Sequence, residues 1–552
     1  MDTASSAENS REGLNPSVSS CYPASHTKDD LREGAIRATH DQHSTTFVEA
    51  IRRYPKAAAW SAVVTLSIIM DGYDTALMGN MFGFPAFQRV YGYMIGSTGS
   101  YTLSLQWQIV LGMATPMGNM VGIYLNALLG EHLGHKPVFL GSLVLLSGLI
   151  SILFFATSLP VLFAGQILCG VPWGVFTTLA PGYASEVVPL ALRSYLETWV
   201  MCCWGIGQLI SYAVLLVLNG WDSQWAYRVP FAIQWVWPVI IIPAAVFCPE
   251  SPWWYVRKGM HDDAERSVRR LTSGPTSERV AEEAKNAVAL MVETDRLEQE
   301  MSKDTSYLAC FRGSDLRRTE VACVSWGAQV LTNFIILRYS SYFFQLAGLT
   351  ADASFKVTVG MGGIHIVFNL LSAPLTGNYG RRTLFLWGCA ALTLPTTTLG
   401  LLALAPQSAK LGSATSAVYL AWFAVWCLTL GPLPYVINGE VSSTRLRSKT
   451  LALARATNLV MQIINSVVAP YILNPQSGDW RGKAGFLTAA LTVLSFTWGY
   501  FRLPETGRRT FEELDILFSE RDLPARKFAK AVIHRHSQTN TVMAPGYSSS
   551  TA

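Results

Sequence analysis

The chain has 552 residues, half of which are hydrophobic and only 14% of which are charged, compared with about 25% in soluble globular domains. This composition excludes an ordinary soluble enzyme and predicts an integral membrane protein. The net charge of +5 does not indicate nucleic-acid binding, because most Lys and Arg lie in the two ends of the chain and in one central segment. That distribution is expected if those parts face the cytoplasm.

Twelve apolar segments are long enough to cross a bilayer, which requires about 20 residues in a helix. Six precede a hydrophilic central segment and six follow it, at about 57–78, 105–129, 137–156, 160–183, 195–218 and 229–247, then 321–346, 355–376, 383–405, 416–437, 450–473 and 484–501. An even number of spans places both termini on one side. Basic residues at 381–382 and 445–449 lie in short loops on that side, so we expect both termini in the cytoplasm.

The spans divide the chain into five expected parts. These are a disordered cytoplasmic N-terminal tail (1–56), an N-terminal six-helix bundle (57–247), a cytoplasmic central segment (248–320), a C-terminal six-helix bundle (321–503) and a cytoplasmic C-terminal tail (504–552). The first tail is polar and Ser-rich, which predicts no cleaved signal peptide. Apolar residues recur at helical spacing over 277–301 and predict an amphipathic helix. This helix is either a latch under the membrane helices or a soluble linker.

The sequence gives no indication of catalysis or of a bound cofactor. Most of the nine Cys lie inside apolar runs, where they behave as small hydrophobic residues, and no CxxC pair is present. A Ser/His/Asp constellation, a metal-spaced cluster and a nucleotide-binding loop are also missing from the sequence. We therefore expect no enzyme, no metal site and no cofactor.

Two similar hydrophilic motifs follow the two blocks of spans, Pro249-Glu250-Ser251-Pro252 and Pro504-Glu505-Thr506-Gly507. A helical membrane protein made of two similar halves is typically a transporter. Further motifs are MDGYDTALMG at 70–79, GQILCGVPWG at 165–174, STRLRSKT at 443–450 and GKAGF at 482–486.

Together these motifs resemble the sugar porters of the major facilitator superfamily, and within it the fungal maltose-permease-like (α-glucoside:proton symporter) branch. The resemblance covers about residues 50–520. It implies an all-α integral membrane protein with twelve transmembrane helices in two pseudo-symmetric six-helix bundles, which rock around a central cavity. The implied partners are a small-molecule solute, protons and the lipid bilayer, and the implied location is the plasma membrane. Residues 130–136 depart from the family pattern, with His where Arg is preferred.

Charged residues at the cytoplasmic helix ends form a candidate gate. Acidic and basic side chains there can pair across the two halves when the inner side of the cavity is shut; alternatively, they only fix the topology. The candidate gate residues are Glu186, Arg193, Glu250, Arg381, Arg382, Glu440, Arg445 and Glu505.

Two carboxylates lie in the first span, where ionisable groups are costly and usually functional. Asp71 and Asp74 are three residues apart and share one helical face. Two neighbouring carboxylates in a low dielectric cannot both ionise easily, which suits one of them to carry a proton. By resemblance, Asp74 matches an aspartate linked to proton coupling, and Asp71 and Arg455 match positions typical of the maltose-permease branch. Alternatively, Asp71 lies at the water interface without a role.

Recognition of a sugar requires amide and hydroxyl groups for its hydroxyls and an aromatic face for its ring. The candidates are the amides Gln166, Gln208, Gln329, Asn333 and Asn465 and the aromatic residues Trp173, Tyr342 and Tyr435. Each aromatic residue has core packing as its alternative. Arg338 replaces a small residue of the family pattern and either lines the cavity or reaches an interface. His365 is either a proton relay or a structural histidine.

Several pocket positions depart from the maltose-like pattern, with Asn119 in place of Glu and Met201 and Val330 in place of amides. Fewer hydrogen-bonding groups predict weaker binding of a plain disaccharide and favour a more apolar or modified solute. We expect a secondary transporter that couples proton entry to uptake of a sugar or α-glucoside. The alternatives are an exporter of a modified or secondary metabolite and a transport-inactive sugar sensor.

Overall fold

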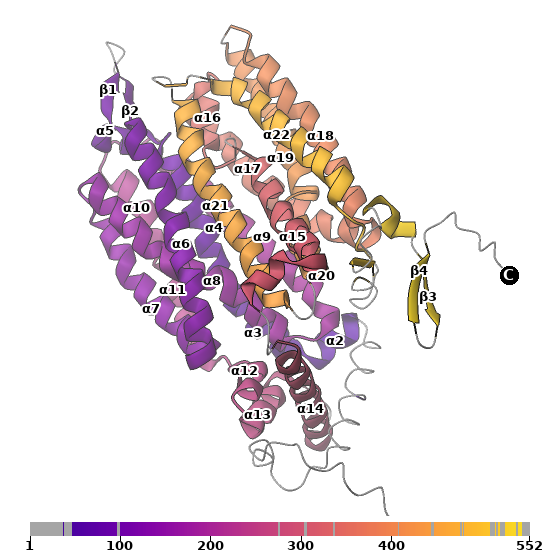
Figure 1. The fold of residues 1–552 in the computed structure, drawn as a ribbon. Helices are drawn as coiled ribbons and strands as arrows, with labels where there is room; N and C mark the ends of the chain where they lie inside the picture. Colours follow the sequence, from indigo (N-terminus) through magenta and orange to yellow (C-terminus); the bar gives the residue numbers. More distant parts are fainter. Residues whose placement is uncertain are drawn as a thin grey trace, which may run out of the picture.

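The computed structural model describes residue 37 and residues 47–95, 100–273, 276–302, 306–334, 337–406, 408–442, 446–474, 477–478, 480–507, 514, 517–518, 525–530, 532–536 and 539–543. Long helices run roughly side by side in two groups (Figure 1), one formed by the first half of the chain and one by the second.

The first half contains α3 (Pro55–Thr65), α4 (Ser67–Met81), α6 (Leu105–Leu133), α7 (His135–Phe154), α8 (Leu159–Val187), α9 (Leu190–Leu218), α10 (Trp225–Ile233) and α11 (Val236–Phe247). The short helix α2 (Phe47–Arg53) precedes them. Between α4 and α6 lie α5 (Pro85–Tyr91) and an antiparallel hairpin of β1 (Tyr93–Ile95) and β2 (Ser100–Thr102), in which Tyr93 pairs with Thr102. The sequence analysis did not predict this hairpin.

The central segment forms α12 (Pro252–Arg257), α13 (His261–Leu271), α14 (Ser277–Ser302) and the 3₁₀ helix η2 (Tyr307–Phe311). The bounds of α14 lie within one residue of those predicted for the amphipathic helix. Its apolar face packs on α12 and α13 in a small core of Val256, Ala264, Val268, Ala284 and Val288. These helices lie at the end of the molecule opposite the β1–β2 hairpin (Figure 1). We call the two ends the central-segment end and the hairpin end.

The second half contains α15 (Gly313–Leu331), α16 (Ser340–Leu346), α17 (Ala351–Asn378), α18 (Arg381–Leu402), α19 (Ala409–Leu428), α20 (Leu433–Val441), α21 (Arg447–Leu473), η4 (Arg481–Lys483) and α22 (Ala484–Arg502). It is followed by η5 (Ala525–Lys530) and a second hairpin of β3 (Val532–His536) and β4 (Thr539–Met543). The two halves meet where α9 packs against α17 and α6 against α21.

In the part of the chain that the structure describes, nine helical segments are long and apolar enough to cross a membrane. The other three predicted spans correspond to α3 with α4, to α6, and to α15 with α16. These three carry polar residues that line an internal cavity, among them Asp71, Asn119 and Gln329, which lowers their mean hydropathy. Two of them are also interrupted, at Leu66 between α3 and α4 and over the residues between α15 and α16.

Candidate functional site

A cavity of about 580 Å³ lies between the two halves of the bundle, within the range of small-molecule sites. The first half contributes side chains from α4, α6, α8 and α9, and the second half from α15, α17, α19, α20 and α21. Amides are frequent in its lining, which includes Gln208, Gln329, Asn333, Asn369, Asn458, Gln462 and Asn465. Amide groups both donate and accept hydrogen bonds, so this lining suits a solute with several hydroxyls.

The cavity reaches toward the central-segment end. Its lining includes Asn126 and Pro181 in the last turns of α6 and α8 and Leu451 in the first turns of α21. The helices α6 and α8 end, and α21 begins, close to the side that carries α12–α14 (Figure 1).

At the hairpin end the two halves are in direct contact. The side-chain oxygen of Asn80 accepts a hydrogen bond from the Ser341 amide at 3.0 Å, and Gln345 donates to the Gly83 carbonyl at 2.7 Å. The ring of Phe82 stacks on Tyr339 with centroids 5.6 Å apart. The cavity therefore extends toward the central segment, and the two halves close together at the opposite end.

The two aspartates of α4 are buried, one at the wall of the cavity and one behind it. Asp71, 6% exposed, lines it and accepts a hydrogen bond from Trp204 Nε1 at 3.0 Å. Asp74, 0% exposed, lies behind the lining, where its Oδ1 accepts from Gln234 at 3.0 Å and Gln166 at 3.5 Å. Among the described residues, the second oxygen of each carboxyl has no hydrogen-bond partner. A proton on that oxygen would remove the cost of a buried negative charge.

Three basic side chains also line the cavity. The guanidinium carbon of Arg455 lies 4.9 Å from the ring centroid of Trp326, and its Nη1 donates to Asn458 at 3.4 Å. Arg338 lies in the interruption between α15 and α16. His365 is buried, with its Nδ1 2.8 Å from Gln208 Oε1.

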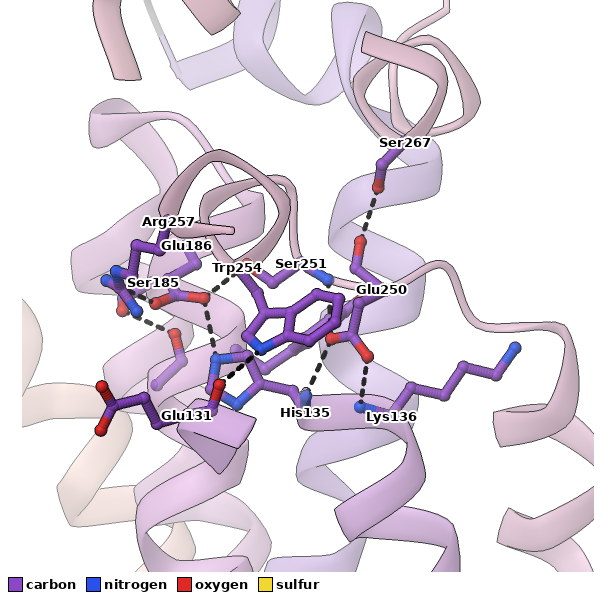
Figure 2. Close-up of polar contacts among 12 residues, drawn as sticks. Glu131, His135, Lys136, Ser185, Glu186, Glu250, Ser251, Trp254, Arg257 and Ser267 are labelled. Carbon is purple, nitrogen blue, oxygen red and sulfur yellow. Dashed lines mark hydrogen bonds and ion pairs between the residues drawn. The ribbon is translucent and has the colours of Figure 1, made fainter. Parts of the chain in front are cut away.

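At the central-segment end, the carboxylate of Glu250 caps the first turn of α7 (Figure 2). Its two oxygens accept from the backbone amides of His135 at 2.9 Å and Lys136 at 3.0 Å, which have no partner inside their own helix. Nearby, Glu186 lies 3.0 Å from His135 Nε2 and accepts from Ser251 Oγ at 2.5 Å and from Arg257 at 3.2 Å. These contacts thereby connect the start of α7 and the last turn of α8 to α12.

The second half repeats this arrangement. Glu505 accepts from the backbone amides of Arg381 at 2.7 Å and Arg382 at 3.2 Å, and so caps α18. Glu440 accepts from Arg381 Nη2 at 2.5 Å and from Thr506 Oγ1 at 2.7 Å. In each half, therefore, one carboxylate accepts hydrogen bonds from the first backbone amides of a helix. A second carboxylate contacts the side chain of that helix's first residue.

The family model described as "Sugar (and other) transporter" matches residues 60–518 of the chain. The chain belongs to this transporter family. It is 36% identical to the general alpha-glucoside permease of Saccharomyces cerevisiae over 506 residues, covering 91% of this chain and 81% of the permease. It is 35% identical to the maltose permease MAL31 of the same yeast, with the same coverage.

Among solved structures, the proton:xylose symporter XylE bound to 6-bromo-6-deoxy-D-glucose superposes with a TM-score of 0.65 at 20% identity. The match covers 84% of this chain and 99% of XylE. The predicted fold class is confirmed by this likeness: the transporter is an all-α membrane protein with the major facilitator fold. Membership of the family also confirms that it is a secondary transporter and not an enzyme.

The structure brings five of the eight candidate substrate residues of this transporter into the cavity, namely Gln208, Gln329, Asn333, Asn465 and Tyr435. The other three do not line it. Gln166 instead bonds Thr115 and Asp74, while Trp173 is buried in α8 and Tyr342 in α16 beside the closed end. Hydropathy and residue type could not distinguish these positions, because both faces of a central helix are buried.

Several residues that line the cavity were not predicted from the sequence, including Gln462, Asn369 and Trp204. A spacing signal was available for all three of these. Gln462 follows Asn458 by four residues and precedes Asn465 by three, which places all three on one helical face. Asn369 follows His365 by four residues in the same way. Trp204 carried the same signal, because it precedes the predicted Gln208 by four residues in α9; its hydrogen bond to Asp71 is seen only in the structure.

The gate prediction concerned pairs across the two halves. In the described part of the transporter, the ion pairs of the candidate gate residues stay on one side of the boundary between the halves. Glu186 pairs with His135 and with Arg257 of α12, and Glu440 pairs with Arg381. Arg445 and the side chain of Arg193 lie outside the described residues. Pairing of the candidate gate residues across the two halves stays a prediction.

Proposed function

We propose that this transporter moves a sugar or α-glucoside by alternating access and couples that movement to protons. The observation that carries the proposal is the amide-rich cavity shared by both halves, with the buried carboxyl of Asp71 at its wall and that of Asp74 behind the wall. The amides suit sugar hydroxyls, and a carboxyl reached from the cavity suits a proton carrier. The names of the yeast relatives, alpha-glucoside and maltose permeases, support this substrate class.

In the proposed cycle, the structure is the state open to the cytoplasm. The basic residues of the central segment and of the loops beside it support a cytoplasmic central-segment end. Both termini would then be cytoplasmic, and the hairpin end would face outward, at the plasma membrane. Opening the hairpin end requires breaking the Asn80–Ser341 and Gln345–Gly83 contacts. Closing the other end would bring the charged residues of the two halves together as a gate.

The test is uptake of radiolabelled maltose and glucose by a transporter-null yeast that expresses the full chain, at two external pH values. Accumulation that is stronger at the lower pH supports proton-coupled import. Equal uptake at both values would contradict the coupling, and no uptake of either sugar would contradict import of these sugars.

One observation favours export of a more apolar solute as a second candidate. Met201 and Val330, which replace amides of the maltose-like pattern, both line the cavity. Loading cells with an apolar glycoside and measuring its efflux, with and without the transporter, distinguishes the two directions.

A further inference from the structure

Arg338 has a fixed position at the closed end of the cavity. It lies in the interruption between α15 and α16, and its side chain is half-buried and lines the cavity. A Cβ placed on Gly79 of α4 would lie only 2.0 Å from the Arg338 carbonyl oxygen. The Arg338 backbone is therefore pressed against the first half, and its guanidinium group belongs to the cavity in this state.

The guanidinium of Arg338 has no local partner among the residues that the structure describes. No hydrogen bond or ion pair within 4.0 Å is formed by it there, in contrast to Arg455, which contacts Trp326 and Asn458. Asp71 takes its hydrogen bond from Trp204, and Asp74 takes its bonds from Gln234 and Gln166. Arg338 acts on both carboxyls only through space. A shielded guanidinium of this kind offers a strong, two-pronged site for a planar anion.

The charge of the cavity lining also favours an anionic solute. Among the described residues, its lining includes the two guanidinium groups of Arg338 and Arg455 and one carboxyl, that of Asp71. Asp74 adds a second carboxyl behind the wall. When these two carboxyls hold protons, as the proposed coupling requires, both positive charges remain without compensation. A neutral solute would leave both positive charges uncompensated. A solute with one negative charge would offset one of the two positive charges, in a site that is partly shielded from water.

We propose that the solute is a sugar that bears a carboxylate, such as a glycoside of a uronic acid, and that Arg338 binds this carboxylate. Amides in the same cavity, such as Asn333 and Gln462, then serve the ring hydroxyls. One guanidinium supplies two parallel donors, which match the two oxygens of a carboxylate, and the single negative charge of a carboxylate equals the single charge of Arg338. This inference rests on the proposed function and narrows its substrate class.

The experiment compares two solutes that differ only at C6, methyl α-D-glucopyranoside and methyl α-D-glucopyranosiduronate. Binding to the purified full chain is measured by isothermal titration at neutral pH, and exchange of each labelled solute is measured in proteoliposomes. We expect the uronate to bind at least about ten-fold more tightly than the glucoside, which corresponds to one charge-assisted interaction. The Arg338→Gln variant should lose this preference and keep glucoside binding, while Arg338→Lys should retain part of it.

Arg89→Gln provides the matched control, because Arg89 is a cation at the same end that pairs with the exposed Asp222 outside the cavity. It should leave the preference unchanged. Tighter binding of the glucoside, or an equal loss of both solutes in Arg338→Gln, would overturn the inference and leave the proposed function standing. Failure of the wild-type chain to bind or exchange either solute would overturn the inference and also contradict the proposed function.

Discussion

The carboxylates of Glu250 and Glu505 occupy equivalent places in the two halves, each on the first backbone amides of a membrane helix, α7 or α18. Both lie directly after the last span of their half, 255 positions apart in the chain. A carboxylate in this position satisfies amides that have no helical partner and interacts favourably with the helix dipole. The repeated Pro-Glu motifs thus attach the end of each half to the middle of the same half.

Both caps require a glycine immediately before the capped helix. A Cβ on Gly380 would lie 2.2 Å from Glu505 Oε2, and one on Gly134, which has φ +95°, would lie 2.6 Å from Glu250 Oε2. We expect Gly380→Ala to displace the Glu505 carboxylate and lower stability by about 1–3 kcal/mol. Thermal unfolding of the detergent-purified protein measures this loss. Gly182→Ala is the control, because a Cβ there meets nothing within 4 Å; similar melting of both variants would contradict the role of the cap.

Asp74→Asn should abolish uphill accumulation of the solute. The amide is nearly isosteric and can keep a hydrogen bond to Gln234, but it cannot take up and release a proton. Exchange of labelled for unlabelled solute across the membrane should persist, because exchange needs no net proton movement. Uptake against a gradient and exchange in proteoliposomes are measured side by side. Uphill accumulation at the wild-type level in this variant would remove Asp74 from the coupling mechanism.

Asn80→Ala should weaken the closed hairpin end. Its side-chain oxygen accepts the Ser341 amide of the opposite half, and loss of a buried acceptor costs about 1–3 kcal/mol. The equilibrium should then shift toward the state open at the hairpin end, measured as faster labelling of a cysteine introduced at a cavity-lining position by a membrane-impermeant reagent added from outside. Gln88→Ala, which removes a bond to Phe82 within one half, should leave labelling unchanged.

The amphipathic helix α14 is attached to the first half through Glu283, which accepts from Arg53 Nη2 at 2.5 Å and Nε at 3.1 Å. Glu283→Gln should weaken this attachment by about 1–3 kcal/mol and expose the central segment to limited proteolysis. Glu300→Gln, which affects only an exposed pair with Arg296 inside the helix, is the control. Equal cleavage rates in the two variants would favour the linker interpretation over the latch.

The sequence predicted the spans well where hydropathy alone decides them, as in α7, and less well where polar residues or breaks occur. It placed α14 within one residue, because six apolar positions recur at helical spacing there. It could not separate α15 from α16, because the interruption between them contains no Pro or Gly and packs closely against α4 at Gly79. Tertiary contacts also explain why the sequence wrongly indicated Gln166 as a solute-binding residue. In the structure this amide bonds Thr115 and Asp74.

The short stretch of chain around the start of α16 contributes both to the contact between the halves and to the lining of the cavity. Tyr339 in the interruption and Ser341 in the first turn of α16 bring the halves together, while Arg338, next to Tyr339, lines the cavity. Any movement that parts the halves must therefore also move the guanidinium relative to α4. Solute binding and the position of the closed end are therefore mechanically coupled. A solute bound by both Arg338 and the first half would delay the conformational change until that solute dissociates.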